Sequence, residues 1–585
     1  MRKLLSGALA LILTISFTLP AHAATAPLWE TDFKEAVKWT QVTQSGILLA
    51  GTNSSLSGVD PDSGAILWTR DDIKKTAPFN TREVTGTPLL IVNDYSGMGT
   101  TVNIYAINQL DGTNVWKSEG QQGMPIGVYA FPKQNVVLLF FLGWNKEEGN
   151  GTHVQALELT TGKKLWDSIY AGVMGGPVLH VVDDSGWFYK KADLSGQQEP
   201  IAIGDYVYIP FKGLDCYNLK TGEKKWSVPF KTGIPLYKKA YPPMVVEGDT
   251  IYAGGYGMVY AINKDTGAIQ WQSTKISSGQ IAELTIADSM LLARVGGFFY
   301  EPGSKKFILD KPLAVIAYDK VKGDKLWEYK KLALGITNLL YLPEQKAVIL
   351  ADGQSLIGLD SQSTGKATEK FKVKLEFTRS IGASEAASAG MKVLTSPGIG
   401  GLLNAGIGLA KSKANRMDIP VSVSLLENGQ VSVRGKQHVM SYDPSSEKIL
   451  WSNYFPASGS GIFEIAVMSA LTFVSAWGTQ ISYASGSMDR GEAEDNIKKA
   501  WDAFDKIMQK RYQASKGNDK KSYILTNVEE DGAKGLGIIA VSLKTGNPDQ
   551  QFLFNEKQPL YTVDETEGKL FHFKNKTKLE AYAVK

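Results

Sequence analysis

VYAINKDTGAIQW, residues 259–271, is one copy of a unit that recurs along almost the whole chain. An apolar run carries a small residue, Ala261, and is followed by Asn263, by a turn closed at Gly267, and by Trp271. Apolar and β-branched residues before a Thr-Gly turn indicate strand, turn, strand. Gly267 supplies the positive φ that the turn needs, and the Asn263 side chain can bond the turn backbone two residues on. A tryptophan at a fixed offset predicts a large ring docked between adjacent units.

Ten such units align along the chain. The first six are complete and carry, in order, Asp60, Gly64 and Trp68; Asn108, Gly112 and Trp116; Glu158, Gly162 and Trp166; Asn218, Gly222 and Trp226; Asn263, Gly267 and Trp271; and Asp319, Gly323 and Trp327. The next three keep only part of the pattern, namely Asp360 and Gly365; Asp443 and Trp451; and Gly546 with Phe552 in place of Trp. The tenth, KLEAYAVK at 578–585, stops before its turn. Self-similarity of this kind along the chain indicates a fold built from stacked structural repeats.

The N-terminal region offers the strand that the tenth unit lacks. The segment APLWETDF, residues 26–33, resembles the Trp-bearing strand, with Trp29 in the matching role. Pairing of first and last strands closes a β-propeller and protects its edges, whereas a linear solenoid needs capping units. We therefore predict an all-β fold: a single closed β-propeller of four-stranded blades, with eight blades by the usual size and up to ten by the repeat count. Two fused rings are the alternative.

The pattern A-[ILY]-[DN]-x3-G-x3-W resembles the repeat of the pyrroloquinoline-quinone-like (PQQ-like) β-propellers. The resemblance is close over residues 28–370 and weaker over 430–585. That family includes the quinoprotein alcohol and glucose dehydrogenases. It also includes non-catalytic envelope propellers, such as the one in the outer-membrane β-barrel assembly machine. The resemblance implies the propeller fold, but it leaves the function open because functional sites are grafted on folds.

The chemistry-bearing residues match the non-catalytic group better. The resemblance implies a disulfide between adjacent cysteines over the quinone of an alcohol dehydrogenase, and this chain has one cysteine, Cys216, at the small-residue position of its unit. A buried structural thiol is expected there. Asp60, Asp319 and Asp443 occupy the turn position, where they have a structural role, and the histidines are scattered singly at His153, His180, His438 and His572. We predict no catalytic, cofactor-binding or metal-binding residue and no cofactor; pyrroloquinoline quinone with Ca²⁺ belongs to the dehydrogenase alternative.

Residues 1–23 read as a cleavable signal peptide. Arg2 and Lys3 precede an apolar core, and Ala21-His22-Ala23 is a small-x-small cleavage site without a neighbouring cysteine. The expected location is therefore periplasmic or secreted, without a lipid anchor. A large exported chain that cannot form an internal disulfide suits a bacterial envelope. The formal net charge of +4 gives no electrostatic footprint for nucleic acid.

Two inserts interrupt the propeller pattern. The predicted organisation is propeller at 24–373, a Gly/Ala-rich insert at 374–418, a blade at 419–456, a helical insert at 457–519, and a closing propeller segment at 520–585. The second insert ends in a predicted amphipathic helix whose apolar face is formed by Ile497, Trp501, Phe504, Met508 and Tyr512. Lys510 and Arg511 suit its C-terminus. The uncharged runs 393–410 and 465–488 either pack within a helical subdomain or dock on a membrane or a partner.

The function predicted from these features is that of a non-catalytic platform for protein binding or envelope assembly, with partners in the cell envelope and no nucleic acid. One alternative is a quinone-dependent dehydrogenase that uses the propeller centre. Another is a binder of carbohydrate or cell-wall ligands, for which Trp144, Trp187 and Trp477 are the candidate contacts because they lie outside the repeat column.

Overall fold

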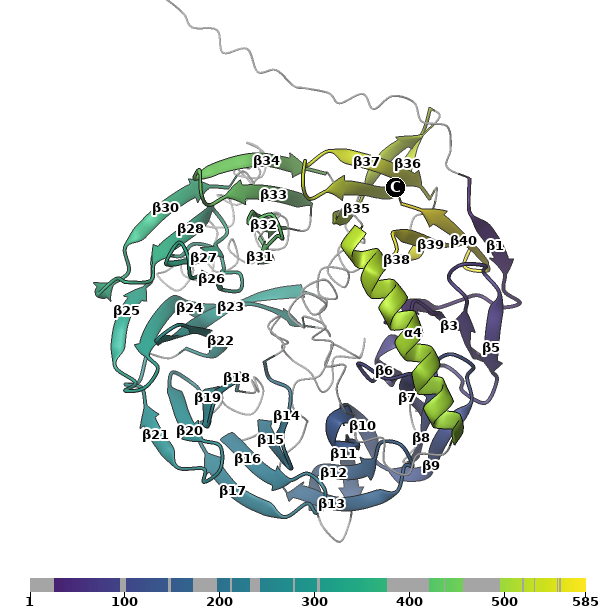
Figure 1. Ribbon diagram of the computed structural model, residues 1–585, viewed down its shortest axis with the longest axis horizontal. Helices are drawn as coiled ribbons and strands as arrows, with labels where there is room; N and C mark the ends of the chain where they lie inside the picture. Colours follow the sequence, from purple (N-terminus) through teal and green to yellow (C-terminus); the bar gives the residue numbers. More distant parts are fainter. Residues whose placement is uncertain are drawn as a thin grey trace, which may run out of the picture.

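A computed structural model of the chain shows a single ring of ten β-sheets around a common centre (Figure 1). The structure describes residues 26–94, 101–145, 149–171, 197–210, 213–231, 242–276, 279–301, 306–375, 420–435, 437–455, 495–517, 520–530, 532–554, 556 and 559–584. The prediction of one closed propeller is confirmed. The blade number is ten, as the repeat count indicated, and not the usual eight.

The first five blades follow one another along the chain, each with four antiparallel strands named A to D from the centre outward. Blade 1 comprises β2 (Trp39–Val42), β3 (Leu48–Gly51), β4 (Leu56–Val59) and β5 (Ile66–Arg70); blade 2, β6 (Thr81–Glu83), β7 (Leu89–Asp94), β8 (Thr101–Asn108) and β9 (Asn114–Gln122); blade 3, β10 (Met124–Phe131), β11 (Val136–Asn145), β12 (Gly149–Glu158) and β13 (Lys164–Ala171); blade 4, β14 (Ile201–Ile203), β15 (Tyr206–Pro210), β16 (Gly213–Asn218) and β17 (Lys224–Pro229); blade 5, β18 (Met244–Glu247), β19 (Thr250–Gly254), β20 (Val259–Asn263) and β21 (Ile269–Gln272). Short 3₁₀ turns η1 (Pro78–Asn80) and η2 (Pro132–Gln134) lie between strands.

The later blades vary more. Blade 6 comprises β22 (Ile281–Ala287), β23 (Met290–Glu301), β24 (Lys306–Asp319) and β25 (Lys325–Tyr329); blade 7, β26 (Leu340–Leu342), β27 (Ala347–Ala351), β28 (Ser355–Asp360) and β30 (Glu369–Lys374); blade 8, β31 (Ser422–Leu425), β32 (Val431–Arg434), β33 (His438–Asp443) and β34 (Lys448–Tyr454); blade 9, β35 (Lys521–Glu530), β36 (Ala533–Ser542) and β37 (Pro548–Leu553); blade 10, β38 (Leu560–Asp564), β39 (Lys569–Lys574), β40 (Lys578–Ala583) and β1 (Trp29–Asp32). A two-residue strand, β29 (Gly365–Lys366), adds a fifth, parallel strand to blade 6. Within the described residues blade 9 has three strands, which correspond to B, C and D.

The ring closes between the two ends of the chain. Strand β1 pairs antiparallel with β40, and Trp29 lies opposite Ala581. The predicted completion of the tenth unit by the N-terminal strand is therefore confirmed, and β1 is the outermost strand of blade 10.

The repeat tryptophan is a wedge between neighbouring blades. The indole N–H of Trp226 in blade 4 donates to the carbonyl of Lys264 in blade 5 at 3.0 Å. Equivalent bonds join six other pairs of neighbouring blades: Trp29 to Pro61, Trp68 to Gln109, Trp116 to Leu159, Trp166 to Leu219, Trp271 to Lys320 and Trp327 to Ser361. Gly267 has φ +73°, and a Cβ there would lie 2.7 Å from the Trp226 ring. Glycine is thus required twice, for the turn and for the wedge.

The small-residue position of the repeat is explained by strand register. Ala261 lies directly opposite Trp271, and Cys216 lies opposite Trp226. Cys216 is fully buried, and burial raises the pKa of its thiol to about 12, which confirms the predicted structural role. In blade 7, where the sequence lacks the tryptophan, Phe371 takes the place opposite Gly358. The incomplete units are therefore blades too.

One α-helix, α4 (Asp495–Gly517), is present among the described residues, and it crosses one face of the ring as a yellow-green ribbon (Figure 1). The predicted helix is confirmed, with Trp501, Phe504 and Met508 buried. Tyr512 was assigned to the buried face, and that assignment is wrong because it is 42% exposed. Arg511 takes its place. Arg511 and Tyr512 lie three and four residues after Met508, so either could face the ring. The ion pairs of Arg511 with Asp564 and Glu567 turn the Arg511 side of the helix toward the ring.

The uncharged runs 393–410 and 465–488 lie outside the described residues, as does the rest of both inserts apart from α4 and a few flanking positions. No helix in the described part of the chain combines the length and the apolar character needed to cross a bilayer.

Candidate functional site

The helix α4 lies on the face of the ring that carries the A–B and C–D turns, which we call the turn face. Its contacts show this placement. Arg511 approaches Gly46 in the A–B turn of blade 1, and Lys510 pairs with Asp62 in the C–D turn of the same blade. Arg511 also pairs with Asp564 and Glu567 at the A–B turn of blade 10. The helix is therefore fastened where the first and last blades meet.

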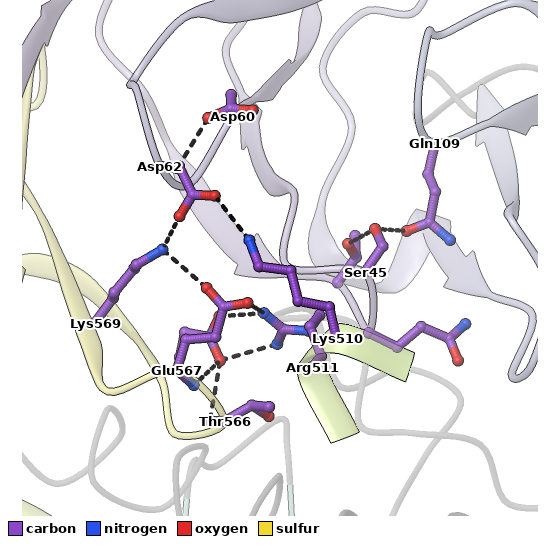
Figure 2. A network of polar contacts seen from close by, with 12 residues as sticks. Ser45, Asp60, Asp62, Gln109, Lys510, Arg511, Thr566, Glu567 and Lys569 are labelled. Carbon is purple, nitrogen blue, oxygen red and sulfur yellow. Dashed lines mark hydrogen bonds and ion pairs between the residues drawn. The ribbon is translucent and has the colours of Figure 1, made fainter. Parts of the chain in front are cut away.

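The centre of this attachment is the buried ion pair of Arg511 with Asp564, and Figure 2 shows Arg511 within the surrounding polar network. The Arg511 guanidinium donates Nη1 to Asp564 Oδ2 at 2.7 Å and Nη2 to Asp564 Oδ1 at 2.9 Å. Glu567 Oε1 lies 3.2 Å from the same Nη1. The exposed fractions of the Arg511 and Asp564 side chains are 5% and 1%. A forked pair in this geometry fixes the orientation as well as the position of the helix end.

A second, more exposed layer extends this pair into a network of six charged groups. The Lys569 ammonium donates to Glu567 at 2.8 Å and to Asp62, and Lys510 lies 3.6 Å from Asp62 (Figure 2). The hydrogen bond from Lys569 holds the pKa of the Asp62 carboxyl below its usual range. Because Asp62 belongs to blade 1 and Lys569 to blade 10, the network bridges the closure of the ring as well as anchoring α4. We call Asp62, Lys510, Arg511, Asp564, Glu567 and Lys569 the clamp.

The other half of α4 is held by apolar packing. Trp501 is 3% exposed and belongs to a buried cluster shared by blades 2 and 3, with Val102 and Val128 among its members. Phe504 and Met508 are buried between this contact and the clamp. The helix is therefore fixed along its length, from the boundary of blades 2 and 3 to the boundary of blades 1 and 10.

The carboxyl group of Glu83 in blade 2 interacts electrostatically with Arg511 of the clamp. Glu83 Oε1 accepts a hydrogen bond from the Gln44 backbone N–H at 2.7 Å. Burial raises the pKa of Glu83 to about 7, and its hydrogen bonds with Gln44 and Gln109 and the charge of Arg511 oppose that rise. Burial therefore keeps the Glu83 carboxyl protonated to a higher pH than an exposed glutamate.

The propeller centre is bridged by the chain itself. Gln197 exchanges two hydrogen bonds with the backbone of Leu284 in blade 6, at 2.7 and 2.8 Å. Two residues later, Glu199 pairs with Arg82 in blade 2 at 3.4 Å. Residues 197–199 thus connect strands A of blades 2 and 6 across the ring, and the polar groups there bind one another.

The residues do not supply a calcium site in the part of the chain that the structure covers. Ca²⁺ takes six to eight oxygen ligands at one point. Among the described residues, no group of three or more His, Cys, Asp or Glu side chains is placed to hold a metal ion. The dehydrogenase alternative would need such a ligand set.

The acidic residues singled out in the sequence have the predicted structural role. Asp60 Oδ1 accepts backbone N–H groups of Asp62 and Ser63, and Asp319 Oδ1 accepts those of Val321 and Lys322. Asp443 does the same for Ser445. Asn263 bonds the turn backbone at residues 265 and 266, as expected.

The three histidines among the described residues lie in different blades: His153 in blade 3, His438 in blade 8 and His572 in blade 10. His438 is buried against the ring of Tyr454, and His572 is stacked on Phe554 with centroids 4.2 Å apart. His153 lies near Phe141, and His180 is outside the described residues.

One of the three candidate ligand-binding tryptophans belongs to a described strand. Trp144 lies in β11 opposite Asn150, and Trp187 and Trp477 are outside the described residues. Their assignment stays a prediction. Sequence reasoning missed the clamp, whose one signal is an arginine that continues the apolar row of α4 three residues after Met508.

Comparison with solved structures finds other propellers at low similarity. BamB from Moraxella catarrhalis is 13% identical, with 63% of this chain and 94% of that chain covered and a TM-score of 0.27. The quinohemoprotein alcohol dehydrogenase ADHIIG from Pseudomonas putida HK5 is 11% identical, with 72% of each chain covered and a TM-score of 0.31. Hsv2 from Kluyveromyces lactis is 8% identical over 58% of this chain and 99% of that chain, with a TM-score of 0.30. No protein of curated function matches the sequence.

The family comparison is more extensive. The family model described as "Outer membrane protein assembly factor BamB" matches residues 20–183, 144–278 and 210–370, which together cover more than half of the chain. These matches span the units whose Trp wedges and Gly turns join the blades. The chain therefore belongs to the PQQ-like β-propeller family defined by this BamB model.

Proposed function

We propose that this protein is an exported, non-catalytic platform that binds protein partners in the bacterial cell envelope and supports their assembly. The observation that carries the proposal is the family match, whose description names an outer membrane protein assembly factor. The signal-peptide pattern of residues 1–23 supports export.

The described structure adds support for binding rather than chemistry. The charged groups of the clamp are used to fasten α4 to the ring, and the acidic residues of the repeats are used to close turns. The polar groups at the propeller centre bridge blades 2 and 6. The described part of the ring also offers two broad faces for binding, one of them crossed by the helix α4.

Site-directed cross-linking tests the proposal. Because Cys216 is buried and its thiol pKa is raised to about 12, a newly introduced cysteine is the only thiol that a maleimide reagent should label in the folded protein. Three exposed positions report on three surfaces: Lys506 on α4, Asn53 in a loop of the opposite face, and Lys372 on the outer rim. Each cysteine variant is labelled with a photoactivatable maleimide in intact cells, and captured proteins are identified.

We expect a defined envelope protein to be captured from at least one face and not from all three positions equally. If no discrete cross-linked product forms, and the protein loaded with pyrroloquinoline quinone and Ca²⁺ reduces a dye with alcohols or sugars, the dehydrogenase function is favoured over the platform function. Saturable binding of a cell-wall oligosaccharide without protein capture would favour the carbohydrate alternative.

A further inference from the structure

The outward side of α4 differs sharply from the side that faces the ring. The ring side carries the buried Trp501, Phe504, Met508 and Arg511. The outward side carries four exposed lysines at Lys498, Lys499, Lys506 and Lys510. At 100° per residue, Lys499, Lys506 and Lys510 fall within about 40° of one another, opposite the centre of the buried face.

Lys499, Lys506 and Lys510 form a cationic row flanked by Lys498, and we call these four residues the lysine ridge. At 1.5 Å per residue, the row from Lys499 to Lys510 is about 16 Å long. Among the carboxylates of α4 whose side chains the structure describes, Asp502 is exposed and Asp505 is half-buried, so the four exposed lysines outnumber them. The chain as a whole is nearly balanced, at +4. The ridge is therefore a local feature and not a sample of a generally basic surface.

The clamp makes the ridge a fixed feature. Arg511 adjoins Lys510 in the chain, and its forked pair with Asp564 sets the rotation of the helix about its axis. Trp501 sets the same rotation from the other end. A preorganised row of charges loses less conformational freedom on binding than the same lysines would on a mobile segment.

We propose that the lysine ridge of α4 binds an acidic segment of a protein partner. This inference rests on the proposed function and names the chemistry of its partner. Charge complementarity across an interface speeds association and selects the partner, and a row of lysines selects a row of carboxylates.

A protein surface fits the ridge better than a lipid surface. Helices that lie on membranes insert an apolar face below the headgroups. The apolar face of α4 is already packed against the ring, so the helix presents charge without an apolar face to insert.

The test uses a fluorescent twenty-residue polyglutamate peptide and the full-length mature protein, with binding measured by fluorescence anisotropy at low salt. The ridge variant is K498E/K499E/K506E, which leaves the clamp residue Lys510 in place. The matched control, K220E/K322E/K366E, reverses the exposed Lys220 and Lys322 on turns of blades 4 and 6 and the exposed Lys366 on β29, and it has the same net charge. We expect the ridge variant to bind the peptide at least tenfold more weakly than the unaltered protein and the control to lose less than threefold.

Equal losses in both variants, or no loss in the ridge variant, would overturn the proposal. Anionic phosphatidylglycerol vesicles provide a second probe: ridge-dependent binding of vesicles without binding of the peptide would assign the ridge to lipid and also overturn it. The outcome is distinguishable from failure of the proposed function. If the Asn53 or Lys372 reporters capture an envelope protein while the ridge variant binds peptide normally, the platform stands and the ridge assignment falls.

Discussion

Replacing Arg511 by methionine tests whether the clamp holds α4 on the ring. Methionine preserves much of the side-chain volume but leaves the Asp564 carboxylate, 1% exposed, without its forked partner. Removing one member of a buried ion pair costs about 3–5 kcal/mol, because the remaining charge stays buried. Asp564 still accepts backbone N–H groups of Thr566 at 3.0 Å and Glu567 at 3.3 Å. We therefore expect the lower end, about 3 kcal/mol.

The loss should appear first as local opening of α4, since the helix has no strand pairing to the ring. A change of about 3 kcal/mol corresponds to roughly a hundredfold in the opening equilibrium. Hydrogen exchange of the α4 amides, measured by mass spectrometry on the native protein, should be faster by that factor in R511M, with the blades little changed. Local measurement is preferable to a global melt because a ring of this size need not unfold in two states.

Two further variants separate the buried pair from charge alone. K164M breaks the pair of Lys164 with Asp167, whose side chains are 56% and 45% exposed, and should cost less than about 1 kcal/mol. The double variant R511M/D564L removes both charges and should recover most of the protection lost in R511M. The reasoning is refuted if α4 exchange in R511M stays within threefold of the unaltered protein, or if R511M/D564L is no better than R511M.

Three other results follow from the structure. In urea unfolding, Gly267→Ala should destabilise the protein by more than Gly204→Ala. Both glycines have positive φ, but only at Gly267 would the new Cβ meet the Trp226 ring. Equal losses of stability would contradict the proposed packing of the tryptophan between blades. Cys216 should react with a thiol reagent at least a hundredfold more slowly in the folded protein than in urea; equal rates would mean that the thiol is accessible. Glu83→Gln should raise stability over that of the unaltered protein by more at pH 8 than at pH 5. The reason is that a folded pKa raised to about 7 makes the unaltered protein lose stability as the pH rises from the unfolded value of 4.5 through 7. Parallel pH–stability curves for the two proteins would rule this out.

The parts of the fold that the sequence predicted are those encoded within one repeat or by the comparison of repeats. The strand–turn–strand unit, the positive φ of Gly267 and the wedge of Trp226 all depend on residues at fixed short offsets. Ring closure was accessible for a related reason: the tenth unit is truncated, and Trp29 stands where its missing strand would begin. Even the degenerate seventh unit could be read as a blade, because Phe371 substitutes for the tryptophan as a large ring opposite Gly358.

The clamp and the central bridge could not be predicted in this way. Whether Arg511 or Tyr512 faces the ring depends on a carboxylate 53 residues later, Asp564, whose position is fixed only once the ring is closed. Apolar periodicity alone favours Tyr512, and this is why the sequence assignment failed. The pair of Arg82 and Glu199 joins residues 117 positions apart in blades that are not neighbours. No local propensity or repeat comparison carries such information.

The placement of α4 gives a physical reason to look for binding on the turn face. The C–D turns of the complete units are constrained in every copy, because each must offer a glycine to the tryptophan of the preceding blade. Such turns have little freedom to diversify into a recognition surface. A helix packed over these turns does not have that constraint. Its buried side contacts the ring through Trp501 and Arg511, and its outward side can carry any pattern of charges. That side carries lysines in a single row, held in a fixed orientation by a buried ion pair, and a fixed charged row on a repeat-constrained face is the feature that a specific acidic partner would recognise.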